Sequence, residues 1–291
     1  MDSSSDKPVN EVPAPRFKPA AALAYRDFRL LWIGLICFMG GMQMHVVARG
    51  YLTYDITSSP IILGLVNSAF AIPMLTCTLF AGVLADRFQK KRIIQLFQAL
   101  AAVTAIFVAV SVITNTITWV HVFVSSVITG TAMAFIIPSR TAIISSLVSE
   151  ENASNAFALN AAGMSTTTLL APAVAGNLYS WLGADGVYFC IAGLEFAAVL
   201  LMGLIRTSDE TTEKRLRKPV FKEIKVGFQY IGRDKLIVVL IVISLSTALL
   251  ARPLRSLLPV FIVDIFNRGP ETLGLLMSCL GIGAIMGSLF V

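Results

Sequence analysis

The chain has 291 residues, of which 56% are hydrophobic and only 14% are charged, with a net charge of +6. So little charge excludes a soluble globular protein of this length, because such a protein exposes far more polar and charged side chains to water. The basic residues gather in the connections between apolar runs, so the positive charge does not indicate a nucleic-acid partner.

Eight apolar runs reach the length that a bilayer crossing requires, about 20 residues at about 1.5 Å of rise each. In hydrocarbon every backbone N–H and C=O must be bonded within its own segment, so each run is predicted to be a helix. The sequence therefore predicts an all-α, multi-pass membrane protein surrounded by the lipid bilayer. The runs are Phe28–Tyr51, Ile62–Ala85, Ile93–Ile113, Ile117–Ile137, Ala156–Leu182, Gly186–Ile205, Leu236–Leu258 and Leu273–Val291.

The first helix is predicted to follow a disordered tail of residues 1–27, whose opening stretch is polar and Pro-rich. The tail and the run after it do not form a signal peptide, because the run is too long and lacks a small-residue cleavage site. When the helices cross the membrane in turn, most basic residues fall on the side of the N-terminus, and the positive-inside rule places that side in the cytoplasm. The four exceptions among the 23 Lys and Arg residues are Arg49, Arg252, Arg255 and Arg268.

Charged and titratable side chains inside the apolar runs are candidate coupling or substrate contacts, because their burial is expensive. His45 and Arg49 lie one turn apart on the first helix, and Arg252 lies in the seventh. Glu195 lies midway along the sixth helix and is predicted to bind a proton or a cation. The alternatives are that Glu195 pairs with a basic residue or reaches the interface.

The sequence shows no sign of a cofactor, a metal site or enzymatic chemistry. The four cysteines stand alone within apolar runs, without the spacing of a metal site or a disulfide framework. No nucleotide-binding loop is present, so an ATP-driven pump is not supported.

The long basic connection of residues 206–235 divides the chain into a six-helix bundle of residues 28–205 and two further helices in residues 236–291. Its second half is predicted to form an amphipathic helix on the inner membrane surface. A repeat crosses this divide, because Asp55–Leu65 and Asp264–Leu275 share Asp-Ile, a turn and Pro-x-x-Leu-Gly-Leu, with the latter part 210 residues apart. The repeat predicts a transporter with a duplicated six-helix half, here a C-terminally truncated fragment or a natural short form.

The stretch GVLADRFQKKR resembles the loop motif between helices two and three of the major facilitator superfamily, with Gln89 where the family has Gly. The stretches Tyr51–Leu65 and Ile137–Gly163 resemble the branch of that superfamily that exports siderophores and macrolides. The fifth helix resembles the Gly-Pro-x-x-x-Gly pattern of efflux members, with Pro172 and Gly176 retained and Ala171 in place of the first Gly. The resemblance extends from the first helix to Val291.

The loop motif is interpreted as a cytoplasmic gate. A glycine lets two helices approach closely, and Asp86 can pair with a basic residue or a helix N-terminus in one access state. Arg140, at the inner end of the fourth helix, is the predicted partner. The alternative is that the basic residues only anchor the topology, and this interpretation suits Lys90, Lys91 and Arg92. The gating motif comprises Gly82, Asp86, Arg87, Lys90, Lys91, Arg92 and Arg140.

The resemblance implies a major-facilitator helical bundle that works as a monomeric secondary transporter in a bacterial plasma membrane. The expected activity is proton-coupled export of an amphipathic small molecule by alternating access. An importer of the same fold and a non-transporting sensor or assembly protein are the alternatives. The sixth helix of this fold usually lies away from the central cavity, which counts against a direct role for Glu195.

Overall fold

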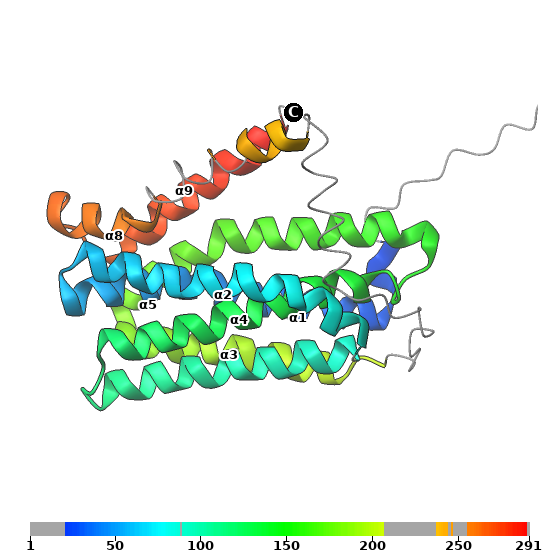
Figure 1. Cartoon of the computed structure of the whole chain (residues 1–291), viewed down its shortest axis with the longest axis horizontal. Helices are drawn as coiled ribbons and strands as arrows, with labels where there is room; N and C mark the ends of the chain where they lie inside the picture. Colours follow the sequence, from blue (N-terminus) through cyan, green and yellow to red (C-terminus); the bar gives the residue numbers. More distant parts are fainter. Residues whose placement is uncertain (1–20, 88, 207–236, 244–245, 247–254, 290–291) are drawn as a thin grey trace, which may run out of the picture.

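The computed structural model describes residues 21–87, 89–206, 237–243, 246 and 255–289. The predicted basic connection with its amphipathic helix, and Arg252, lie outside the described residues. The described elements are helical, with no strand among them, so the predicted all-α class is confirmed (Figure 1). They are η1 (Ala21–Ala24), α1 (Arg26–Thr57), α2 (Pro60–Arg87), α3 (Lys90–Ile113), α4 (Trp119–Ile144), α5 (Glu150–Gly203), α8 (Leu258–Val260), η2 (Phe261–Ile265) and α9 (Pro270–Leu289).

Helices α1 to α5 are long and apolar enough to cross a membrane. Large apolar side chains project outward from them, and Ile72, Leu75, Leu96 and Val103 are each at least 60% exposed. Exposed apolar surface on this scale is costly in water and favourable in lipid. The outer surface therefore fits a bilayer.

Helix α5 contains the two predicted helices five and six, joined at Gly183. Gly183 has φ 76° and ψ −177°, a conformation that residues with a Cβ rarely adopt. The backbone therefore turns there, at the predicted connection Gly183–Asp185. We refer to residues 150–182 as the first arm of α5 and to residues 184–203 as the second arm.

The two copies of the sequence repeat also share a local structure. Ser58 ends α1 with φ 47°, and Pro60 begins α2; Asn267 follows η2 with φ 49°, and Pro270 begins α9. Proline suits the first turn of a helix, because its fixed φ is helical and it needs no hydrogen-bond acceptor. The repeated sequence thus encodes the same helix boundary twice. A residue in the left-handed conformation ends one helix, and a proline begins the next.

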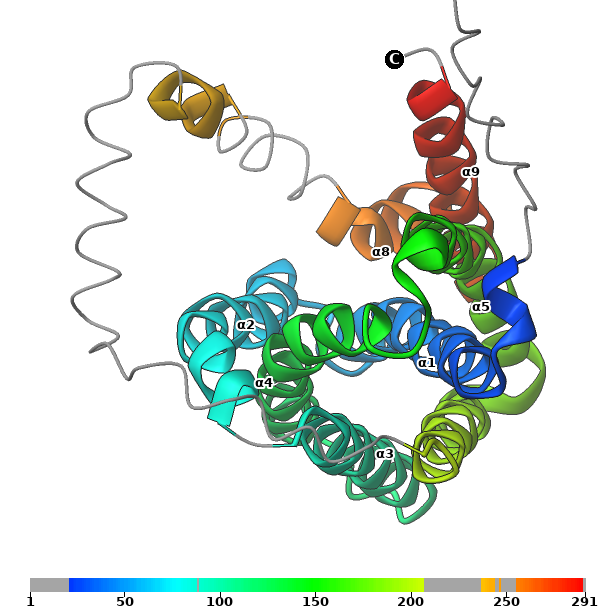
Figure 2. The same cartoon turned by 90° about the vertical axis from the view of Figure 1, so that its right-hand side faces the viewer.

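Helix α1 packs between the two arms of α5 (Figures 1 and 2). A Cβ at Gly34 would lie 3.7 Å from Leu201 Cβ, and a Cβ at Gly41 would lie 3.2 Å from Glu195 Cγ; Leu201 and Glu195 are both on the second arm. On the other side, a Cβ at Gly163 of the first arm would lie 3.1 Å from Leu35 Cδ2. Small residues on both sides of α1 let the three helices approach closely.

The remaining helices complete the bundle. Helix α4 packs against α2 and α3, and α3 packs against α5. Gly130 of α4 faces the backbone of α2 so closely that a Cβ there would clash with the Phe70 carbonyl. Seen end-on, α3 and the second arm of α5 lie on the side away from α8 and α9 (Figure 2).

Part of the predicted tail of residues 1–27 is helical in the described structure. Residues Ala21–Ala24 form the short helix η1, and Ala22 is fully buried. The Ala22 N–H donates to Asn155 Oδ1 (3.0 Å), and Trp32 Nε1 donates to the Leu159 carbonyl (2.8 Å). These hydrogen bonds attach the start of α1 to the start of the first arm of α5, an attachment that composition alone does not reveal.

Candidate transport gate and buried charges

Helix α9 packs tightly against the first arm of α5 through two glycines. A Cβ at Gly176 would clash with the Pro270 carbonyl, and a Cβ at Gly274 would clash with the Pro172 carbonyl. Further along, a Cβ at Gly281 would lie 3.2 Å from Leu169 Cα. Both predicted motif residues of the fifth helix, Pro172 and Gly176, therefore lie in this contact between parts of the chain that are distant in sequence.

Hydrogen bonds accompany the glycine packing. The Ala173 N–H donates to Ser278 Oγ (3.1 Å), next to Pro172, which itself has no N–H to donate. Ser180 Oγ donates to Glu271 Oε2 (2.5 Å) at the end of the same arm. Both bonds join the first arm of α5 to α9.

The end of α1 contacts the same C-terminal segment. The Tyr54 hydroxyl donates to Asp264 Oδ2 of η2, and a Cβ at Gly50 would lie 3.3 Å from Pro259 Cγ of α8. All these contacts lie toward one end of the bundle, beside the turn at Gly183. We call this set the gate; its residues are Gly50, Tyr54, Gly176, Ser180, Pro259, Asp264, Glu271 and Gly274.

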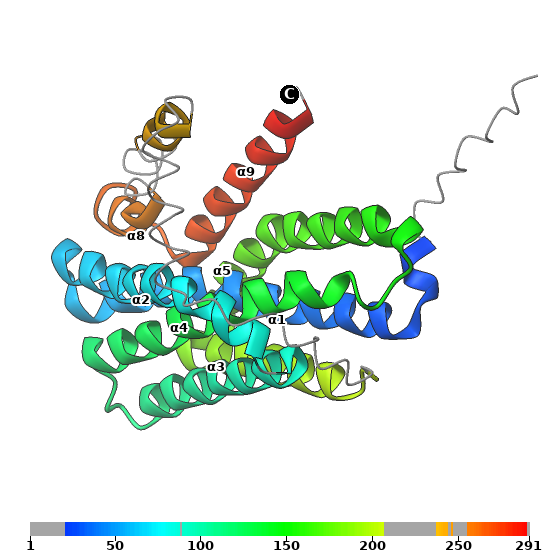
Figure 3. The ribbon, with the colours of Figure 1, turned by 45° about the vertical axis from the view of Figure 1, so that its right-hand side comes forward.

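Beyond the gate, α9 diverges from the first arm of α5. Figures 1 and 3 show the two helices side by side near α8 and separating toward the other end. Within the described residues, α9 and the first arm of α5 are therefore closed against each other toward the end near α8. Sequence analysis identified Pro172 and Gly176 but did not connect them with Pro270 and Gly274, although both of these lie in the repeated segment Asp264–Leu275.

The predicted gating motif lies at the opposite end, between α2 and α3. The side chains of Gly82, Asp86 and Arg87 lie outside the described residues, so the predicted pairing of Asp86 stays a prediction. Lys90, Lys91 and Arg92 form the first turn of α3.

Lys91 has a role that sequence analysis missed. Its Nζ donates to the Gly203 carbonyl (3.0 Å) and the Ile205 carbonyl (2.6 Å). A cation here bonds the carbonyls that the end of the second arm of α5 leaves without helical partners. Lys91 therefore joins α3 to α5 at this end of the bundle.

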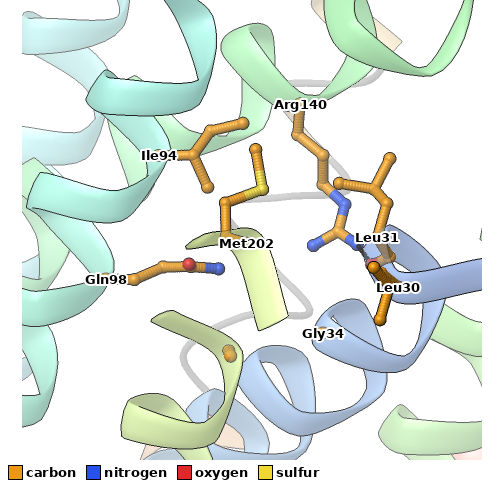
Figure 4. A pocket seen from close by; sticks show the side chains of 8 residues that line it. Leu30, Leu31, Gly34, Ile94, Gln98, Arg140 and Met202 are labelled. Atoms are coloured by element: carbon orange, nitrogen blue, oxygen red, sulfur yellow. Dashed lines mark hydrogen bonds between the residues drawn. The ribbon is translucent and has the colours of Figure 1, made fainter. Parts of the chain in front are cut away.

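Arg140 lies inside the bundle and is only 5% exposed. Its Nη2 donates to the Leu31 carbonyl of α1 (2.9 Å), and its Nε has no hydrogen-bond partner among the described residues. Figure 4 shows the guanidinium group in a small pocket opposite the Gln98 amide. Arg140 is the residue predicted to pair with Asp86. In the described structure it bonds the backbone of α1. The other lining residues are Leu30, Gly34, Ile94, Ala198 and Met202.

The titratable residues predicted from the apolar runs are brought together in part. His45 (2% exposed) and Glu195 (fully buried) both lie between α1 and the second arm of α5. Arg49 is also buried, with its Cζ 4.8 Å from the centre of the Phe70 ring on α2, a cation–π contact. Glu195 therefore does not reach the interface, and neither of its oxygens bonds a basic residue within the described chain.

The chain is similar to a known protein family, to several named proteins and to solved structures. The model of a family described as transmembrane secretion effector matches residues 17–291. The chain is 23% identical to the multidrug efflux pump Tap of Mycolicibacterium fortuitum over 258 residues, covering 86% of this chain and 62% of that protein.

Two further relatives have a similar extent of match. The staphyloferrin A transporter of Staphylococcus aureus is 24% identical, with 89% of this chain and 62% of that protein covered. Macrolide efflux protein A of Streptococcus pyogenes is 23% identical, with 91% and 65% covered. The chain thus spans about three fifths of the length of the relatives it matches.

Among solved structures, the fold is similar to a bacterial homologue of the human lysosomal transporter Spinster in an inward-facing, unoccupied conformation. The TM-score is 0.69 at 17% identity, and the match covers 91% of this chain and 62% of that chain. At this identity the likeness shows the fold alone.

The hydrogen bond between Tyr54 and Asp264 generates a test of the gate. Tyr54→Phe removes one hydroxyl and should raise the ratio of open to closed gate by about five-fold, because a net hydrogen bond contributes about 1 kcal/mol. The measurement is single-molecule energy transfer between dyes on the exposed turn at Asn115 and on Arg268. Tyr51→Phe is the matched control, and an unchanged ratio for Tyr54→Phe would remove the hydroxyl from the gate.

Proposed function

The chain belongs to the transmembrane secretion effector family of the major facilitator superfamily, and from this premise we propose that it is a secondary active exporter. Its fold and family are those of membrane transporters. The proposed cargo is an amphipathic small molecule, since the relatives include a multidrug efflux pump, a staphyloferrin A transporter and a macrolide efflux protein.

The observation that carries the proposal is the one-ended contact at the gate. Helix α9 touches the first arm of α5 through Gly176, Gly274 and Gly281 and diverges from it farther along (Figure 3). A contact made of glycine packing and a few hydrogen bonds can open without separating buried ion pairs. Alternating access requires such a contact, which closes one side of a substrate path while the other is open.

We further propose that the gate faces the outside of a bacterial plasma membrane. The opposite end carries the first turn of α3, with three consecutive basic residues, and η1, where the described part of the chain begins. Basic residues favour the cytoplasmic side. In this orientation the structure is closed outward, with its α9 side diverging toward the cytoplasm.

Reporter fusions test this orientation. A reporter that is active only in the periplasm should work at Asn115, in the turn between α3 and α4, and should be silent at Lys214. Because the basic residues dictate the orientation, the reverse pattern would contradict it. A cytoplasmic reporter at the same two positions is the control, with the opposite activities expected.

Proteoliposomes test the transport function. With the transporter reconstituted, fluorescent amphipathic substrates should leave the side that corresponds to the cytoplasm when a pH gradient is imposed, and a protonophore should abolish this movement. Transport in the other direction would favour an importer. The absence of transport for siderophores, macrolides and dyes alike would favour a sensor or an assembly protein.

The α2–α3 motif generates a separate prediction. In the transporter, Asp86→Asn should lower the efflux rate by about ten-fold while membrane insertion stays normal, since it removes a charge that stabilises one access state. Glu151→Gln, which neutralises an exposed acid at the start of α5, is the matched control. Normal efflux by Asp86→Asn would reduce the motif to a topological anchor.

A further inference from the structure

A row of buried polar side chains lies between α1 and the second arm of α5. His45, Arg49, Tyr188 and Glu195 are each at most 6% exposed. Both His45 ring nitrogens, the Tyr188 hydroxyl, Arg49 Nε and both Glu195 oxygens lack a hydrogen-bond partner among the described residues. Buried polar atoms are normally bonded, so four neighbouring exceptions indicate a role other than structural support.

The two helices bring these side chains together in register. The His45 and Tyr188 rings are in edge-to-face contact, with centroids 5.2 Å apart and planes at 88°. One turn earlier on α1, the missing side chain of Gly41 makes room for Glu195, because a Cβ there would lie 3.2 Å from Glu195 Cγ and 3.8 Å from Oε1. Glu195 therefore lies beside Gly41, one helical turn from His45 along α1.

We propose that Glu195 and His45 form one proton-binding site inside the N-terminal bundle, enclosed by Gly41 and Tyr188. Glu195 takes up one proton as its carboxylate becomes a carboxylic acid, and no other bond is formed or broken. His45 contributes the dipole of its buried ring one turn away. The site itself is independent of transport; its use in coupling rests on the function proposed above.

The charged side chains on neighbouring elements have other contacts, so Glu195 is the acid of this site. Arg49, two turns from Gly41, directs its guanidinium to Phe70 on α2. Arg140 of α4 bonds the Leu31 carbonyl, nearer the other end of α1, and Lys91 of α3 bonds the carbonyls at the end of α5. The described part of α2 contributes no charged side chain, and on the first arm of α5 Tyr179 contacts Tyr51 near the gate.

Infrared difference spectroscopy of the protein in lipid nanodiscs tests the site directly. A protonated, buried carboxyl gives a C=O stretching band that shifts in D2O and disappears as the carboxyl ionises. We expect one such titrating band in the native protein. It should be lost in Glu195→Gln and retained in Glu151→Gln, whose acid is exposed.

His45 is tested with the other histidine of the chain as its matched control. In His45→Gln the frequency of the band should shift, because an amide replaces the ring dipole that lies one helical turn from Glu195. His121→Gln, which alters the N-terminal cap of α4, should leave the band unchanged.

A third variant avoids removing either group. Gly41→Ala should shift the frequency of the band, since its methyl group presses against the Glu195 side chain. A band that persists in Glu195→Gln, or a band frequency in His45→Gln equal to that in His121→Gln, would overturn the proposal.

Transport separates this inference from the proposed function. If the band behaves as expected, Glu195→Gln should abolish the dependence of efflux on an imposed pH step in proteoliposomes. The expected spectra together with efflux that ignores pH in the native protein would refute proton coupling and leave the proton-binding site in place. Proton-coupled efflux by a native protein that lacks the band would support proton coupling and refute the proton-binding site.

Discussion

The close packing of α1 between the two arms of α5 is the constraint on which the rest of the structure depends. Gly34 and Gly41 let the second arm approach α1, and Gly163 lets α1 approach the first arm. The C-terminal end of α1 is thereby positioned to meet η2 at the gate, while its middle faces Glu195. A larger side chain at Gly41 would displace Glu195 before it affected any exposed surface.

Two cations of this bundle bond backbone carbonyls. Buried Arg140 donates to the Leu31 carbonyl, and half-buried Lys91 donates to the carbonyls of Gly203 and Ile205. Carbonyls at helix ends or beside a buried guanidinium accept these bonds without a second charge in the membrane. At the end opposite the gate, Arg140 thus joins α4 to α1, and Lys91 joins α3 to the second arm of α5.

The gate is built differently, from glycine contacts and from hydroxyl groups that donate to carboxylates. Gly176 and Gly274 exclude side chains from the α5–α9 contact, and Ser180 and Tyr54 add hydrogen bonds at its margin. Each contact contributes little by itself, and none buries an isolated charge. Such a contact suits a protein that alternates between two arrangements of similar free energy, because neither state is strongly favoured.

The sequence by itself determined the membrane class, the helices and the two repeated helix boundaries, because hydropathy, glycine and proline act through local backbone physics. It also placed Pro172 and Gly176 in a packing motif and marked His45, Arg49 and Glu195 as costly residues to bury. Only the tertiary structure decided which neighbour each one contacts. Gly176 contacts α9 and Arg49 contacts Phe70, while Glu195 lies beside Gly41 and bonds no charged partner among the described residues. Helices in hydrocarbon are apolar on many faces, so the hydropathy pattern of a helix does not specify which helix packs against it. Contacts between distant segments depend on how glycines and aromatic rings fit together in three dimensions.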